Sequence, residues 1–267
     1  MSFPDTQSAG QLHFDEPAPG VARLRISNPA KRGALDHAIL DRFVALVPQL
    51  DHRCLLITGE DSTFSAGYDI GDLPDEVFAD QAERLVAHPF TAAIDAIVAF
   101  PYPTLASLNG HCIGGGLELA ISCDLRIAAR EIKLGMPPAK LGLVYSHTGI
   151  RRFIETVGAP RTRELFLTGR RIDTDTALSW GLVNQLAGAA ELEAATLALA
   201  TEIANNAPLA QTGNKRVIDA VLAAGTDLDP ALEAELISLR KACFSSEDFR
   251  EGVRAFAEKR TPRWKNR

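Results

Sequence analysis

Three consecutive glycines at positions 114–116 constrain the fold of this 267-residue chain more than any other feature of its sequence. They follow residues 103–109, which have the pattern of a short buried strand, and they precede residues 117–122, which have the pattern of a helix start. Glycine between a strand and a helix permits a positive φ and lets a ligand approach the backbone closely. The first N–H groups of a helix also lack partners within the helix. The run therefore predicts a turn that either binds a ligand or allows tight packing.

A second turn of the same kind occurs earlier in the chain. Residues 64–70, with the sequence Phe-Ser-Ala-Gly-Tyr-Asp-Ile, follow an apolar strand predicted over 54–59. Two such turns lying side by side would direct two backbone N–H groups at one oxygen atom, which is the arrangement of an oxyanion hole. Neither turn has the glycine and lysine spacing of a nucleotide-binding motif.

The order of predicted elements indicates an α/β fold of stacked ββα units. Strands are predicted over 21–27, 54–59, 103–109 and 125–129, and helices over 35–50 and 76–100. Beyond residue 150 the pattern is mainly helical, with helices expected over 159–168, 173–180, 192–205, 208–224 and 231–243. Because sheet-forming segments come first and helices last, we expect a helical C-terminal region packed on an α/β core.

Charge and composition exclude several classes of protein. The chain has 28 Lys and Arg against 34 Asp and Glu, a net charge of −6, so a general nucleic-acid binder is not expected. Its longest apolar stretch, residues 90–108, is interrupted by Asp95, Pro101 and Pro103, which argues against a membrane span. The first residues lack the features of a secretory signal, and the four cysteines form no C-x-x-C pair. We therefore expect reduced thiols and a cytoplasmic location, and the scattered histidines predict no metal site.

The two glycine turns together resemble the paired signatures of the crotonase (enoyl-CoA hydratase/isomerase) superfamily. Four further segments resemble that family in the expected order, so that the match covers about residues 10–260: these are 28–35, 168–172, 177–184 and 247–260. The resemblance implies a crotonase-like spiral of ββα units. In that fold residues 1–200 would form the acyl-CoA-binding core. Residues 201–267 would form a helical region involved in oligomerisation, as a homotrimer or a hexamer.

The resemblance also implies a site for an acyl-CoA thioester. The backbone N–H groups of Tyr68 and Gly115 would be the two oxyanion donors that stabilise a thioester enolate. Coenzyme A would enter as part of the substrate, so no separate cofactor is expected. The residues implied in its binding are Lys31, Arg32, Ala34, Ala66, Asp69 and Ile70, with Lys259 contributed by another subunit.

Which of the family's two catalytic glutamates are present in this chain indicates which reaction it can carry out. The first catalytic glutamate falls on Glu118, whose apolar neighbours Leu117 and Leu119 predict a buried side chain with a raised pKa. The second falls on Pro138, which cannot transfer a proton. Together with Tyr145, this resembles the methylmalonyl-CoA decarboxylase branch, where a tyrosine lies near the substrate carboxylate and loss of CO₂ forms the enolate directly.

These residues favour an acyl-CoA lyase with decarboxylase-like C–C bond cleavage, in which Tyr68, Gly115, Glu118 and Tyr145 form the catalytic site. Two alternatives stay open. One is an enoyl-CoA hydratase or isomerase that uses Glu118 as its single acid/base. The other, more remote, is a CoA-binding protein without catalytic activity. The sequence does not identify the acyl group.

Overall fold

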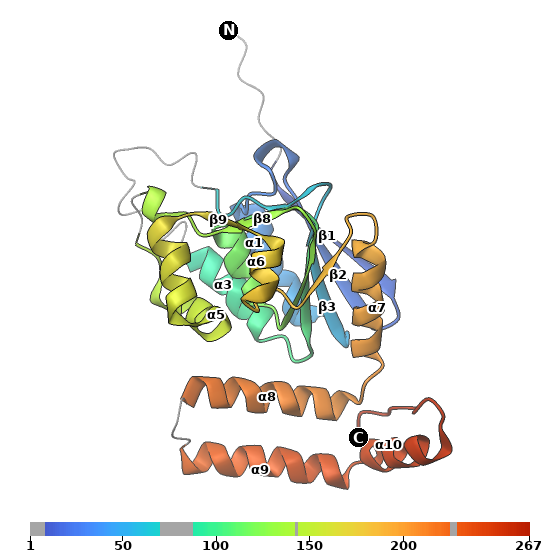
Figure 1. Ribbon diagram of the computed structural model, residues 1–267. Helices are drawn as coiled ribbons and strands as arrows, with labels where there is room; N and C mark the ends of the chain where they lie inside the picture. The colour runs from blue at the N-terminus through green and yellow to red at the C-terminus, as the bar shows by residue number, and fades with distance from the viewer. Residues whose placement is uncertain (1–8, 70–87, 142–143, 225–228) are drawn as a thin grey trace.

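The computed structural model describes residues 9–69, 88–141, 144–224 and 229–267, and its α/β core contains two sheets (Figure 1). The larger sheet has the order β1-β2-β3-β5-β7-β10, and the smaller has the order β4-β6-β8-β9. The strands of the larger sheet are β1 (Gln11–Ala18), β2 (Val21–Ser27), β3 (Cys54–Gly59), β5 (Thr104–Leu108), β7 (Leu125–Ala129) and β10 (Gln185–Ala187). Those of the smaller sheet are β4 (Thr63–Ser65), β6 (His111–Ile113), β8 (Lys133–Gly135) and β9 (Arg171–Asp173).

The predicted ββα repeat is visible in how successive strands divide between the two sheets. Strands β3, β5 and β7 pair in parallel in the larger sheet, while the strands that follow them, β4, β6 and β8, pair in parallel in the smaller one. Helices α3 (His88–Val98), α4 (Gly115–Ile121) and α5 (His147–Thr168) follow these strand pairs. The α/β spiral expected from the sequence is therefore confirmed.

Packing on the larger sheet accounts for the apolar character of its strands. Residues 54–57 of β3 are almost completely buried, as are residues 105, 106 and 108 of β5. Parallel strands covered on both faces lose the alternation of polar and apolar residues. Helices α1 (His37–Leu46) and α3 pack against each other beside this core.

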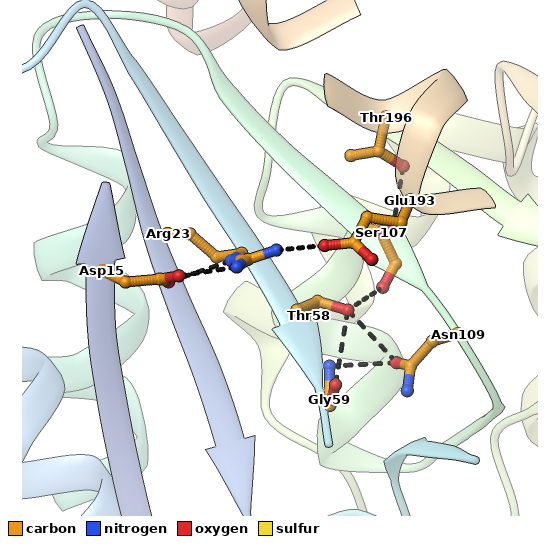
Figure 2. Close-up of polar contacts among 8 residues, drawn as sticks. All are labelled: Asp15, Arg23, Thr58, Gly59, Ser107, Asn109, Glu193 and Thr196. Carbon is orange, nitrogen blue, oxygen red and sulfur yellow. Dashed lines mark hydrogen bonds and ion pairs between the residues drawn. The ribbon is translucent and has the colours of Figure 1, made fainter. Parts of the chain in front are cut away.

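Polar side chains attach helix α7 (Leu192–Ala204) to the larger sheet (Figure 2). Arg23 on β2 donates hydrogen bonds to Asp15 on β1 and to Glu193 on α7. The hydroxyl groups of Ser107 and Thr196, both buried, lie 3.0 Å apart. Because buried polar groups require partners, these contacts fix α7 on the sheet.

Asn109 fixes the ends of two strands next to the glycine turns. Its Oδ1 accepts a hydrogen bond of 3.0 Å from the backbone N–H of Gly59 (Figure 2). Its Nδ2 donates to the carbonyl of Asp61 at 2.9 Å. Gly59 and Asp61 lie where the chain leaves β3 for β4. This contact therefore sets how β4 and the first glycine turn are held relative to β5.

The structure differs from the predicted elements at several boundaries. Helix α5 begins at His147, twelve residues before the predicted start at 159, and it contains a break at Gly158, where φ is 77° ahead of Pro160. The break separates two helical stretches, of which the sequence pattern predicted only the second. The helix expected over 76–100 is described only as α3, since residues 76–87 lie outside the described part. The three-residue strands of the smaller sheet were not predicted, because three residues are too few to show a period.

The C-terminal helices α8 (Pro208–Ala224), α9 (Pro230–Ser245) and α10 (Glu247–Glu258) lie together on one side of the core (Figure 1). Lys215 on α8 forms a 2.7 Å ion pair with Asp124, which precedes β7. Arg216 joins α8 to α9 through Glu235, at 2.9 Å. The division at residue 200 and the role of this region in oligomerisation stay predictions. In the part of the chain that the structure describes, no helix is long and apolar enough to cross a membrane.

Candidate active site

The three glycines occupy the junction between β6 and α4, and two of them have clear structural roles. Gly114 adopts φ 57° and ψ −127°, a conformation that L side chains rarely adopt. A Cβ on Gly116 would lie 2.6 Å from the Cβ of Ser65, so α4 packs directly against β4. Gly115 is the first residue of α4, where an N–H has no partner within the helix. Its N–H is the one that the predicted oxyanion hole requires.

The second turn brings Tyr68 to the same place. Leu35 and Tyr68 form a parallel bridge, in which the N–H of Leu35 donates to the carbonyl of Gly67 and its carbonyl accepts from the N–H of Asp69. In such a bridge the N–H of the central residue, Tyr68, points away from Leu35. A Cβ on Gly115 would lie 3.3 Å from the Tyr68 nitrogen, and a Cβ on Gly67 would lie 3.2 Å from the Gly115 nitrogen. The structure thus brings together the two backbone groups predicted as donors.

The predicted CoA-binding residues gather beside this turn. The Ala66 N–H donates to the carbonyl of Arg32 at 3.0 Å, and Lys31 Nζ lies 2.6 Å from Asp69 Oδ2. Arg32 has a positive φ of 54°, and Ala34 is buried. Residues 28–35 and 66–69 therefore form one continuous backbone surface.

Two other residues expected to bind CoA are not part of this surface. Ile70 lies outside the described residues. Lys259 is exposed just beyond the end of α10, in the C-terminal region. Its contribution from another subunit stays a prediction.

Glu118 lies in the first turn of α4, three residues beyond Gly115, and only 3% of its surface is exposed. The Tyr145 hydroxyl donates a 2.5 Å hydrogen bond to its Oε2, and Arg152 Nη1 lies 3.4 Å from its Oε1. Burial raises the pKa of Glu118, while the Tyr145 hydrogen bond and the Arg152 charge act in the opposite direction. A buried carboxyl group whose pKa is raised is better suited to exchange protons than an exposed one.

Tyr145 contacts Glu118 and Phe166, whereas Pro138 lies in a short 3-10 helix. The Tyr145 ring packs edge-on against Phe166 of α5 at 5.5 Å, and burial together with the Glu118 charge raises the pKa of its hydroxyl. Tyr145 therefore stays protonated and acts as a hydrogen-bond donor. Pro138 is buried in a short 3-10 helix (Pro138–Leu141) and carries no group that can transfer a proton.

The side chain of Tyr68 is directed toward the start of α1. Its hydroxyl lies 3.4 Å from Nε2 of His37, and the two rings meet edge-on at 6.4 Å. Burial raises the pKa of Tyr68 to about 12, with smaller contributions from nearby aspartates. Because only its backbone N–H is needed as a donor, this side chain can shape the site without taking part in proton transfer.

Sequence reasoning missed two residues of the site. Arg152, on α5, reaches Glu118 across 34 residues of sequence. Phe90, on α3, lies so close to Gly115 that its Cε2 would be 3.3 Å from a Cβ placed there. Adjacent arginines at 151 and 152 are typical of an exposed helix face, and no local pattern indicates which of them turns inward. In the described residues no cluster of three or more His, Cys, Asp or Glu side chains is arranged to hold a metal ion.

Comparison with known proteins agrees with this geometry. The family model for Enoyl-CoA hydratase/isomerase matches residues 16–267. The carnitinyl-CoA dehydratase of Salmonella typhi is 30% identical, over 96% of this chain and 98% of its own. A Bacillus subtilis protein named probable enoyl-CoA hydratase is 34% identical, over 92% of this chain and 95% of its own. A crystal structure of enoyl-CoA hydratase from Bacillus anthracis has a TM-score of 0.87 at 28% identity and covers 96% of this chain and 99% of its own.

These matches span nearly the whole chain, as do the six segments that resemble the family. The protein belongs to the enoyl-CoA hydratase/isomerase family, which is the crotonase superfamily expected from the sequence.

Proposed function

We propose that this protein adds water to an enoyl-CoA thioester, or removes it from the corresponding hydroxyacyl-CoA, with Glu118 as its single acid/base. The observation that carries the proposal is the position of Glu118. Its buried carboxyl group lies one helical turn beyond Gly115, whose N–H is brought next to that of Tyr68. The names of the relatives, a hydratase and a dehydratase, support water chemistry over C–C bond cleavage.

The proposed reaction needs one carboxylate and two backbone donors. Glu118 accepts a proton from water as the water oxygen attacks C3 of the enoyl group. The electron pair of the double bond moves to the thioester oxygen, where the N–H groups of Tyr68 and Gly115 stabilise the negative charge. Glu118 then returns the proton to C2, so that water has been added across the double bond. Losing one such donor costs about 3–4 kcal/mol of transition-state stabilisation in other enzymes.

Isomerisation of an enoyl-CoA uses the same parts. Glu118 would remove a proton from one carbon of the acyl chain and return it to another, with the same N–H groups stabilising the dienolate. The two reactions differ in whether a water molecule occupies the site beside Glu118.

The decarboxylase-like reaction favoured by the sequence has less support. The Tyr145 hydroxyl already donates a hydrogen bond to Glu118. A substrate carboxylate placed beside Tyr145 would also approach the Glu118 carboxylate, and like charges in a buried site repel each other. The comparisons favour the hydratase or isomerase alternative. A CoA-binding protein without activity is the remaining candidate.

A side-by-side assay distinguishes these candidates. Crotonyl-CoA, a 3-enoyl-CoA and methylmalonyl-CoA are supplied to the wild-type protein and to Glu118→Gln, and hydration, double-bond migration and CO₂ release are followed. The proposal predicts hydration of crotonyl-CoA that is lost in Glu118→Gln. Release of CO₂ by both proteins would overturn it in favour of decarboxylation. Tight CoA binding without turnover of a broad acyl-CoA panel would indicate a binding protein.

A further inference from the structure

The two oxygens of the Glu118 carboxylate have different partners, and one of these partners was not foreseen from the sequence. Oε2 accepts a hydrogen bond from Tyr145, whereas Oε1 lies 3.4 Å from Nη1 of Arg152. The Glu118 side chain is 4% exposed and that of Arg152 is 23% exposed, so the pair is largely shielded from water. A charge pair shielded in this way is weakened much less by salt than one at the surface.

We propose that Arg152 is a positioning residue. Together with Tyr145 it fixes the plane of the Glu118 carboxylate, and it holds that group in the ionised form that can accept a proton from water. This inference rests on the proposed role of Glu118 as acid/base and extends it to a residue that does not itself touch the reacting atoms.

The first turn of α5 explains why Arg152 reaches Glu118. Ser146 caps this helix by accepting a 3.1 Å hydrogen bond from the N–H of Gly149. A Cβ on Gly149 would lie 2.8 Å from Oε1 of Glu118 and 2.7 Å from the ring of Tyr145. The carboxylate therefore packs directly on the helix backbone at Gly149. Arg152 is three residues further along and thus on the same face of the helix.

The surroundings of Arg152 keep its guanidinium directed at Glu118. Nη2 lies 3.8 Å from Oδ1 of Asp95 on α3, so the guanidinium is held between two carboxylates. Among the described residues, Tyr145 and Arg152 are the groups that act on the charge of Glu118, and Asp95 acts on Arg152. Both donors oppose the effect of burial, which by itself would favour a protonated carboxyl group.

Removing the Arg152 charge tests the inference, and the neighbouring Arg151 supplies a matched control. Arg151 pairs with Glu155 and donates to the backbone of α8, so Arg151→Met removes one arginine from the same helix without touching Glu118. The test variants are Arg152→Met, Arg152→Gln and Arg152→Lys. Two properties are measured for each variant: the pH dependence of kcat for hydration, and the titration of Glu118 by infrared spectroscopy. Glu118→Gln identifies the carboxyl band.

The expected results follow from charge. In Arg152→Met and Arg152→Gln the Glu118 titration moves to higher pH by about one unit or more, because an opposite charge has been removed. The acidic limb of the kcat profile moves with it, and kcat near neutral pH falls about 10- to 100-fold while KM changes less. Arg152→Lys keeps the charge, so its Glu118 titration stays near that of the wild type, although the ammonium group restores kcat only in part. Arg151→Met changes neither property.

An unchanged Glu118 titration in both Arg152→Met and Arg152→Gln would overturn the inference, as would equal shifts in Arg151→Met. The infrared measurement requires folded protein but no turnover. If the wild type hydrates no enoyl-CoA, the proposed function fails, while the titration still decides whether Arg152 controls the charge of Glu118. Thermal unfolding of every variant confirms that the folded state is compared. If the uncharged variants do not fold, Arg152→Lys still tests the positioning role, because full wild-type kcat in that variant would contradict it.

Discussion

The Tyr145 hydroxyl donates a 2.5 Å hydrogen bond to Oε2 of Glu118 across 27 residues of sequence. This contact joins the segment before α5 to the first turn of α4. It also lowers the pKa of Glu118 against the larger effect of burial, which raises it. Tyr145→Phe should therefore raise the pKa of Glu118 further. Since the proposed reaction starts from the carboxylate, the acidic limb of the kcat profile should move to higher pH.

The magnitude follows from the loss of a hydrogen bond to a charged group, about 1.5–3 kcal/mol, so kcat below the new limb should fall about tenfold or more. The profile of kcat against pH for wild type and Tyr145→Phe checks this. Tyr102→Phe, at a partly buried tyrosine that packs against the core, is the control and should leave the profile unchanged. Full hydration by Tyr145→Phe with loss of CO₂ release from methylmalonyl-CoA would contradict the proposed function.

Two variants in the glycine run should affect different properties: one should lower activity and the other should lower stability. A Cβ on Gly115 meets Tyr68 N and the Phe90 ring at 3.3 Å, so Gly115→Ala should fold but place a methyl group where the thioester oxygen must bind. Its kcat/KM should fall about 100-fold or more. A Cβ on Gly116 would lie 2.6 Å from Ser65 Cβ and 2.8 Å from the Ser65 carbonyl oxygen. Gly116→Ala should therefore lose about 1–3 kcal/mol of unfolding free energy.

Chemical denaturation and initial-rate kinetics measure both properties for each variant. Equal losses of stability in the two variants would show that Gly115 is also needed for packing. Full activity in Gly115→Ala would contradict the predicted position of the thioester oxygen beside the Gly115 Cα.

The 2.6 Å pair between Lys31 and Asp69 predicts how cations contribute to CoA binding. If Lys31 binds a CoA phosphate, Lys31→Met should raise KM about fivefold at low salt, with little change in kcat. Asp69→Asn leaves the lysine in place and removes the negative charge of Asp69, so KM should stay the same or fall. Because exposed ion pairs are screened, the difference between wild type and Lys31→Met should shrink as salt is added. A KM for Lys31→Met equal to that of the wild type would place the phosphates elsewhere.

The position of Phe90 next to Gly115 predicts that its ring limits the length of the acyl chain. Removing this ring in Phe90→Ala should open space beside the oxyanion donors and shift preference toward longer acyl chains. The ratio of kcat/KM for a longer enoyl-CoA over crotonyl-CoA should rise about tenfold, the usual effect of a methylene-sized change in an apolar pocket. Val98→Ala changes an exposed residue of the same helix and is the control. An unchanged ratio in Phe90→Ala would show that the acyl chain runs along another wall.

An exposed apolar stripe on α8 bears on the predicted homotrimer or hexamer. Ile218, Val221 and Leu222 are 58%, 45% and 50% exposed, and their spacing of three and four residues places them on one face of the helix. If this face meets another subunit, the double variant Ile218→Asp with Leu222→Asp should dissociate the oligomer into monomers. Ala223→Asp, at an exposed position of the same helix that lies off this stripe, should not. Light scattering coupled to size-exclusion chromatography gives the masses, and a monomeric wild type would contradict the prediction.

Much of the fold could be predicted because its determinants are local. The apolar run 54–59 and the helical period over 35–50 became β3 and α1 with small shifts at the ends, and the run of glycines at 114–116 marked the junction of β6 and α4. The short strands β4, β6, β8 and β9 could not be predicted in this way. Three residues each leave no periodicity to detect, and such strands form because they pair with one another in the smaller sheet.

The candidate site, like the fold, could be predicted from the sequence only where its determinants are local. The sequence by itself predicted the two glycine turns, because a turn that contains Gly67 or Gly114 can be recognised from neighbouring residues. The roles of Tyr68, Gly115 and Glu118 were implied by the resemblance to the family, and they stay predictions. Only the tertiary structure decided that Arg152 holds Oε1 of Glu118 and that Phe90 lies over Gly115. Those contacts join residues from separate helices. Their positions depend on how α3, α4 and α5 pack against one another, which no local pattern of residues specifies.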